Sequence, residues 1–119
     1  MTVTRMYPRL VVSDARAAIS FYEKVFGAVL SETFSDDSGK IVHAEVSFGS
    51  AGVVGIKDHG DGDEPVSVIM ALDVTDPDEV AAAMEAGGAS VIYPIADHEY
   101  GRGGRLRDPW GIQWMLMRP

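Results

Sequence analysis

The chain has 119 residues, of which 18 are acidic and 10 are basic, and its formal net charge is -8. This length fits one domain with a core of its own, and the acidity argues against nucleic acid and anionic membranes as partners. Because the sequence has no cysteine, no long apolar run and no signal-peptide pattern, we expect a cytoplasmic protein without disulfides or thiolate chemistry.

The first half of the chain predicts one helix among four strands. Residues 7–12 end in an apolar run, which is typical of a strand covered on one side. Asp14 suits an N-cap, apolar residues recur at helical spacing over 15–26, and Gly27 suits the end of a helix. Further strands are expected at 29–34, 41–48 and 53–57, with polar and glycine-rich turns between them.

Residues 58–65 separate this half from the next. The segment has four carboxylates and no apolar residue to anchor it, so we interpret 59–65 as a solvated acidic linker. A calcium loop is the alternative. The spacing does not match the twelve-residue calcium pattern, and the terminal bidentate Glu is missing.

The second half repeats the order of the first. A strand is expected at 66–74, and Asp76-Pro77-Asp78-Glu79 combines an N-cap, a proline at N1 and a glutamate at N3 before a helix that ends at Gly87-Gly88. A strand at 90–95, a glycine-rich loop and a hairpin that turns at 108–111 complete it. The copies are offset by about sixty residues, which indicates an internal duplication.

We therefore predict an α+β fold of two tandem βαβββ modules within a single domain, residues 1–119. Module one covers residues 1–58, and module two covers residues 66–119. One helix can cover only one face of four strands, so the other face must curve around something or meet another chain.

Four short motifs follow one another along this plan: Leu10-Val11-Val12-Ser13-Asp14, the FYxxxFG of 21–27, Ala86-Gly87-Gly88 and the DPxG of 108–111. With them the chain resembles the glyoxalase, bleomycin-resistance and extradiol-dioxygenase superfamily, also called vicinal oxygen chelate proteins. The resemblance implies paired modules that form a partly open, barrel-like curved sheet around a small-molecule cavity, often completed in a homodimer.

In metal-dependent members of that family the ligands are His, Gln or Glu side chains. The resemblance places them at Tyr7, Gly55, Ile69 and Met115 of this sequence, none of which suits a hard metal ion. It therefore implies the metal-free branch, whose best-known members bind and sequester an antibiotic, and we expect no cofactor. A divalent metal at another position is the alternative.

Strand alternation sorts the residues that face the cavity from those that face the helices. If Leu10 and Val12 pack on the helix, the residues between and before them point the other way. The same test leaves a mixed polar and apolar lining, as in small-molecule pockets. Its members from the strands are Tyr7, Arg9, Val11, His43, Glu45, Ser47, Ser67, Ile69, Ala71, Gln113, Met115 and Met117.

His43 and Glu45 are the most distinctive pair on that face. Two residues apart on a strand, they lie on one side at ~6.6 Å at the backbone. They could be relocated metal ligands or a pair that moves a proton, or equally a solvated ion pair. No third or fourth ligand is evident.

Residues 97–110 add arginines and aromatic side chains. Arg102, Arg105 and Arg107 could hold an anion, or they could pair with the neighbouring acidic residues. His98, Tyr100 and Trp110 could stack on a planar ligand, or only wedge the chain against the sheet.

We expect a homodimeric binding protein for a small, partly aromatic or anionic molecule. The ten candidate ligand-binding residues are Tyr7, Arg9, His43, Glu45, Ile69, His98, Tyr100, Arg102, Gln113 and Met115. An enzyme of the same fold, a lyase, isomerase or dioxygenase with a divalent ion on His43 and Glu45, is the second hypothesis. An interaction protein whose concave face is filled by its dimer partner is the third.

Overall fold

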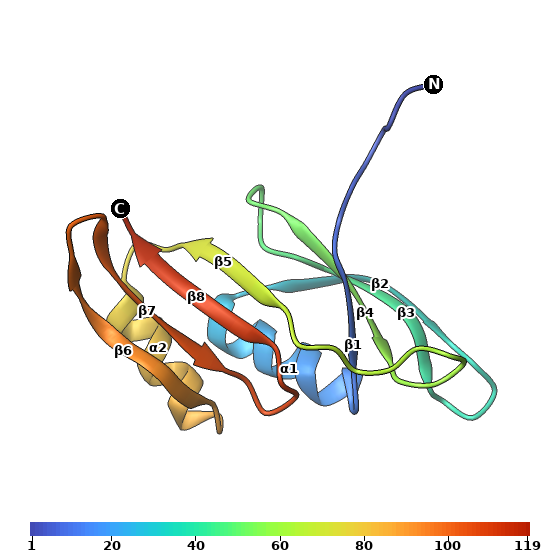
Figure 1. Ribbon diagram of the computed structural model, residues 1–119. Coiled ribbons are helices and arrows are strands. Elements are labelled where there is room, and N and C mark those ends of the chain that lie inside the picture. Colours follow the sequence, from blue (N-terminus) through green and yellow to red (C-terminus); the bar gives the residue numbers. More distant parts are fainter. The chain divides into compact units, whose positions relative to one another are not determined.

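The computed structural model describes residues 1–119 and divides into two compact units, Met1–Pro65 and Val66–Pro119. Each unit contains one helix and a four-stranded mixed sheet (Figure 1). The predicted α+β class and the repeated order of one strand, one helix and three strands are confirmed. Neither helix is long and apolar enough to cross a membrane.

The first unit places its helix on one face of its sheet. Its elements are β1 (Arg9–Val12), α1 (Ala15–Phe26), β2 (Val29–Ser35), β3 (Ile41–Ser47) and β4 (Val53–Asp58). The strand order is β1-β4-β3-β2, with β1 parallel to β4 and the other pairs antiparallel. Alternate strand residues, among them Leu10, Val46 and Ile56, are buried with Ile19 and Tyr22 of the helix, so the opposite face is free to carry polar groups.

The second unit repeats this arrangement. Its elements are β5 (Ile69–Asp73), α2 (Pro77–Ala86), β6 (Ser90–His98), β7 (Gly101–Arg107) and β8 (Gln113–Arg118), in the order β5-β8-β7-β6. Strand β5 is parallel to β8, and the other pairs are antiparallel. Trp114, Leu116 and Leu106 are buried, as is Met84 of the helix.

The helix boundaries follow from their capping residues, as predicted. The Asp14 carboxylate accepts a hydrogen bond from the Ala17 amide, and Gly27 takes the left-handed conformation with φ 66° that ends α1. In the second unit the Asp76 carboxylate accepts from the Glu79 amide, and Pro77 opens α2. These bonds satisfy amide groups that the first turn of a helix leaves without partners.

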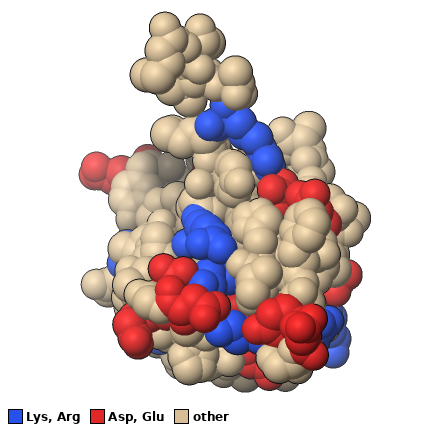
Figure 2. Space-filling model, turned by 90° about the vertical axis from the view of Figure 1, so that its right-hand side faces the viewer, with Lys and Arg blue, Asp and Glu red and all other residues tan.

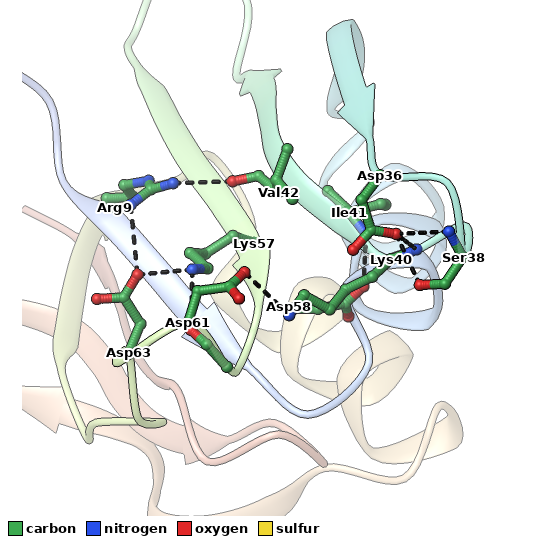
Figure 3. Close-up of polar contacts among 11 residues, drawn as sticks. Arg9, Asp36, Ser38, Lys40, Ile41, Val42, Lys57, Asp58, Asp61 and Asp63 are labelled. Carbon is green, nitrogen blue, oxygen red and sulfur yellow. Dashed lines mark hydrogen bonds and ion pairs between the residues drawn. The ribbon is translucent and has the colours of Figure 1, made fainter.

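The segment predicted to be a solvated linker is tied to the first unit by its acidic side chains (Figure 3). Asp58 accepts hydrogen bonds from the amides of Ala15 at 2.7 Å and Ile41 at 2.8 Å. Asp63 pairs with the buried Lys57 at 2.6 Å, and Asp61 pairs with Lys40 at 3.0 Å. The carboxylates therefore anchor the segment, although it has no apolar anchor.

Basic and acidic side chains lie next to one another over much of the face shown in Figure 2. Ion pairs occur in both units, such as Lys40 with Asp61 in the first and Arg102 with Asp78 in the second.

The glycine-rich stretch that was expected to be a loop is a strand. β6 continues to His98, and β7 begins at Gly101, so the two strands form a hairpin. A Cβ at Gly104 would lie 2.5 Å from the carbonyl oxygen of Tyr93, and one at Gly103 would overlap the Met117 sulfur and the Leu116 carbonyl oxygen. Only residues without a side chain fit here, so the glycines mark a close approach of neighbouring backbone within the sheet rather than a loop.

Candidate functional site

A cavity of about 380 Å³ lies within the second unit. Ligand sites in proteins commonly measure roughly 300–1,000 Å³. The cavity is lined by β6, the following turn, β7 and β8, through Tyr93, His98, Tyr100, Gly103, Gly104, Arg105, Met115 and Met117. Its wall is therefore aromatic and apolar, with one permanently charged group.

The glycines of β7 contribute to the hollow. Gly103 and Gly104 present only backbone to the cavity, while Met115 and Met117 of the adjacent strand β8 supply flexible apolar side chains. Methionine adapts to irregular shapes. The cavity floor can therefore mould to a ligand without a change in the sheet.

Two aromatic rings stand parallel beside the cavity. The ring centroids of His98 and Tyr100 lie 5.0 Å apart with an interplanar angle of 3°, and Tyr100 is 68% exposed. A flat, exposed aromatic surface of this kind suits stacking on a planar ligand. His98 and Tyr100 were both predicted as ligand-binding residues, and the structure places both at the cavity.

Arg105 is the charged member of the cavity wall. Its guanidinium carbon lies 5.5 Å from the centroid of the Tyr93 ring, and its Nη1 donates to Gln113 Oε1 at 3.4 Å. No carboxylate of the second unit lies within ion-pair distance, and its buried Nε has no hydrogen-bond partner. A buried donor without an acceptor costs about 1–3 kcal/mol, so this arginine has unused capacity to bind an anion.

Arg102 behaves differently from Arg105. It donates to both oxygens of Asp78, at 2.8 and 2.9 Å, and to Asp97 at 3.0 Å. The hydrogen bond that Asp78 accepts from Arg102 lowers the pKa of Asp78. The structure therefore places Arg102 in a bridge to helix α2, outside the cavity lining; of its two partners, only Asp97 is one of the acidic residues beside it in the sequence.

A second cluster of polar residues lies on the first unit, on the sheet face away from α1. Arg5 donates to Glu45 at 2.6 and 3.3 Å, and Nε2 of His43 lies 3.1 Å from Glu45 Oε2. The guanidinium of Arg5 also sits 4.1 Å from the ring centroid of Tyr7. The structure thus brings together three of the predicted residues, Tyr7, His43 and Glu45, and adds Arg5.

The electrostatics of this cluster follow from the pair of Arg5 and Glu45. The hydrogen bond from Arg5, assisted by one from His43, lowers the pKa of Glu45 from 4.5 to about 2. The same bond raises the pKa of Arg5. Glu45 is therefore a carboxylate at any ordinary pH, and it acts as an acceptor or a ligand rather than as an acid.

Three remaining predicted residues lie outside both groups. Arg9 donates to the Val42 carbonyl at 2.8 Å and approaches Asp63 at 3.7 Å. Ile69 is 48% exposed on β5, and Gln113 bonds Arg105 and Ser67. Arg9 thus binds other groups of the protein, and Gln113 is connected to the cavity by its hydrogen bond with Arg105.

The positions at which the family resemblance implies metal ligands do not fit a metal ion. Gly55 and Ile69 carry no donor atom, and Met115 offers a thioether, which prefers soft metals. A Cβ at Gly55 would already lie 3.2 Å from the side chains of His43 and Tyr7, so there is little room for a longer ligand there.

Sequence reasoning missed Tyr93, Gly103 and Gly104 of the cavity, Arg5 of the polar cluster, and Glu32, which has a carboxylate oxygen within 4.8 Å of the donor atoms of His43 and Glu45. Tyr93 lies beyond a shift in the register between β6 and β7, and Glu32 lies beyond a similar shift between β2 and β3, so simple alternation does not locate them. Arg5 belongs to an N-terminal segment without regular structure. The hydrophobic periodicity that marks strands and helices therefore could not predict where Arg5 lies.

Residues 4–116 match the family model described as the Glyoxalase/Bleomycin resistance protein/Dioxygenase superfamily. The chain is also 34% identical over 123 residues to the uncharacterized protein Mb0911c of Mycobacterium bovis, a match that covers 94% of this chain and 81% of that protein. The uncharacterized protein Rv0887c of Mycobacterium tuberculosis has the same identity, with 72% of its length covered.

Several solved structures share the fold. TioX from Micromonospora sp. ML1 is 27% identical, with a TM-score of 0.76 and 98% of each chain covered. TnmS3, an antibiotic binding protein from Streptomyces sp. CB03234, is 21% identical, with a TM-score of 0.74 over 100% of this chain and 98% of that one.

Proposed function

The chain belongs to the Glyoxalase/Bleomycin resistance protein/Dioxygenase superfamily, and from this premise we propose that it binds a small planar aromatic molecule that carries an acidic group. The ligand occupies the cavity of the second unit and is held without a metal ion. The observation that carries the proposal is Arg105, a cation in an aromatic and apolar wall with a buried donor that no protein group satisfies.

Each part of the ligand has a counterpart in the cavity. The parallel rings of His98 and Tyr100 offer a stacking surface for an aromatic plane. The guanidinium of Arg105, which no carboxylate pairs, offers a charge-assisted hydrogen bond to a carboxylate or phenolate. Met115 and Met117 offer an adaptable apolar floor. TnmS3 is an antibiotic binding protein, which supports small-molecule binding by this fold and does not identify the ligand.

The test uses 2-naphthoate and its neutral analogue 2-naphthamide as probes, in fluorescence and calorimetric titrations of the intact chain. We expect the acid to bind more tightly than the amide. In Arg105→Met the binding of naphthoate should weaken about tenfold or more, because a hydrogen bond to a charged group contributes about 1.5–3 kcal/mol, and the preference for the acid should disappear.

Arg107→Met is the matched control. Arg107 is an exposed arginine on the same strand that does not line the cavity, so its loss should leave the preference unchanged. Equal affinities for acid and amide in the unmodified chain, or equal effects of the two substitutions, would contradict the proposal.

We also propose that the chain is a homodimer, as the family resemblance implies. In support, β2 lies at an edge of its sheet, and its apolar residues Val29 and Phe34 are 60% and 54% exposed. Sedimentation equilibrium tests this: a species of 12.8 kDa, the mass of one chain, at all concentrations would refute dimer formation.

A further inference from the structure

Three potential metal ligands meet on the first unit. Glu32 of β2 and His43 and Glu45 of β3 each offer one donor atom, and these atoms all lie within 4.8 Å of one another. Glu32 and Glu45 are direct partners across the two strands, and His43 follows two residues away on the same face. Neighbouring strands hold ligand positions more firmly than loops do.

The spacing of two of these donors already suits a shared ion. Nε2 of His43 and Oε2 of Glu45 are 3.1 Å apart. Two ligands at the zinc bond lengths of about 2.0–2.2 Å in tetrahedral geometry are separated by about 3.3–3.6 Å. The exposed side chain of Glu32 needs only to rotate toward them. An ion could therefore be accommodated without movement of the sheet.

The charge of the cluster also favours a cation. Glutamates directly opposite each other on neighbouring strands repel, and Glu32 and Glu45 occupy such a pair. In the structure Arg5, which binds Glu45 from the N-terminal segment, offsets this repulsion together with His43. Arg5 is 46% exposed and comes from outside the regular structure, so it can be displaced.

We propose that Glu32, His43 and Glu45 bind one divalent transition-metal ion of the zinc type, and that Arg5 competes with the ion for Glu45. One imidazole and two carboxylates suit zinc or manganese, and three protein ligands leave a coordination position open to water. None of its three ligands is one of the four residues at which the family resemblance implies ligands, although His43 lies beside two of them, Tyr7 and Gly55. It does not depend on the ligand cavity of the second unit.

The experiment is a calorimetric titration of the untagged, full chain with zinc chloride, after treatment with a chelator. We expect one ion per chain. His43→Ala and Glu32→Gln should weaken binding about tenfold or more, since even supporting residues of metal sites contribute about 10–100-fold. Arg5→Ala should strengthen binding about two- to fivefold, the equivalent of one exposed ion pair.

Two control variants separate this site from adventitious binding. His59→Ala removes another, exposed histidine, and Glu23→Gln removes an exposed carboxylate of α1; both should bind zinc as the unmodified chain does. Circular dichroism verifies that every variant is folded. Zinc uptake that His43→Ala and His59→Ala weaken equally would overturn the proposal, and so would the absence of uptake by the Arg5→Ala chain.

Discussion

The carboxylate of Asp108 accepts three hydrogen bonds in the second unit, and its removal should destabilise the protein strongly. Oδ1 accepts from the amides of Trp110 at 2.9 Å and Ile112 at 3.0 Å, and Oδ2 accepts from the indole nitrogen of Trp114 at 2.9 Å. Asp108 is 3% exposed and Trp114 is fully buried. The substitution Asp108→Ala therefore leaves donors that water cannot easily reach.

The magnitude follows from the donors that are left behind. Each buried donor without an acceptor costs about 1–3 kcal/mol. Since the Trp110 amide is only partly buried and can recover some hydration, we expect a total loss of about 3–5 kcal/mol. A domain of this size has about 5–15 kcal/mol of stability, and the melting temperature should fall by about 10–20 °C.

Thermal and urea denaturation followed by circular dichroism measure this loss. Asp108→Asn should lose less, because an amide oxygen can still accept from the two backbone donors while its NH2 group faces the indole of Trp114. Asp37→Asn, at an exposed position in a turn, is the control and should change stability by no more than about 0.5 kcal/mol. If Asp108→Ala melted within about 2 °C of this control, the hydrogen bonds of Asp108 would not stabilise the turn as argued.

Three further predictions address other parts of the chain. Asp58→Ala should cost about 2–4 kcal/mol, measured by urea denaturation, because the amides of Ala15 and Ile41 lose their acceptor; a loss no greater than that of Asp37→Asn would contradict this. Gly104→Ala should destabilise by about 1–3 kcal/mol, since its Cβ would meet the Tyr93 carbonyl at 2.5 Å, whereas Gly52→Ala, with open space around it, should cost less than about 1 kcal/mol. Because the folded protein lowers the pKa of Glu45 from 4.5 to about 2, this carboxylate stabilises the protein above pH 4.5 and loses that contribution as the pH falls toward 2; Glu45→Gln should flatten the melting temperature over that range, and an unchanged acid profile would refute it.

The sequence predicted the helices better than the strands because the helix ends are marked by local chemistry. Asp14 and Gly27 bound α1 at the predicted residues, and Asp76 caps α2. The first strand was expected from Tyr7 but begins at Arg9. Pro8 has no amide hydrogen to donate to a neighbouring strand; its carbonyl accepts from the Gly55 amide of β4 at 2.8 Å, and the paired residues begin at Arg9.

The candidate site was predicted in part. Alternation along β3 placed His43 and Glu45 on one face, where the structure has them. Alternation could not supply Glu32, because an irregularity between Leu30 and Glu32 shifts the register. Alternation along β7 would also have placed Gly103 and Arg105 on one face of a strand, but the glycines of this stretch predicted a loop. That interpretation left Arg105 in a charged cluster rather than in a cavity wall.

The registers of the two sheets explain why the duplicated units differ in chemistry. Glu45 stands opposite Gly55 in the first unit, and Arg105 stands opposite Met115 in the second. One register position thus carries an anion in one copy and a cation in the other. In the first unit the side chains of His43 and Tyr7 occupy the space beside Gly55, since a Cβ on Gly55 would lie 3.2 Å from each of them.

In the second unit the roles of the two strands are exchanged: the glycines are on β7 and the large side chains on β8. The Met117 sulfur takes the place that a side chain at Gly103 would occupy, and Met115 and Met117 line the cavity. The exchange gives the first unit a crowded, negatively charged cluster suited to a cation, and the second unit a hollow with an unsatisfied arginine suited to an anion. Glu45→Arg should therefore abolish zinc binding by the first unit, because it removes a ligand and adds a positive charge. Since each cluster is built from residues of its own unit, the preference of the second unit for naphthoate over naphthamide should remain. Loss of that preference in the folded variant would show that the two sites do not act independently.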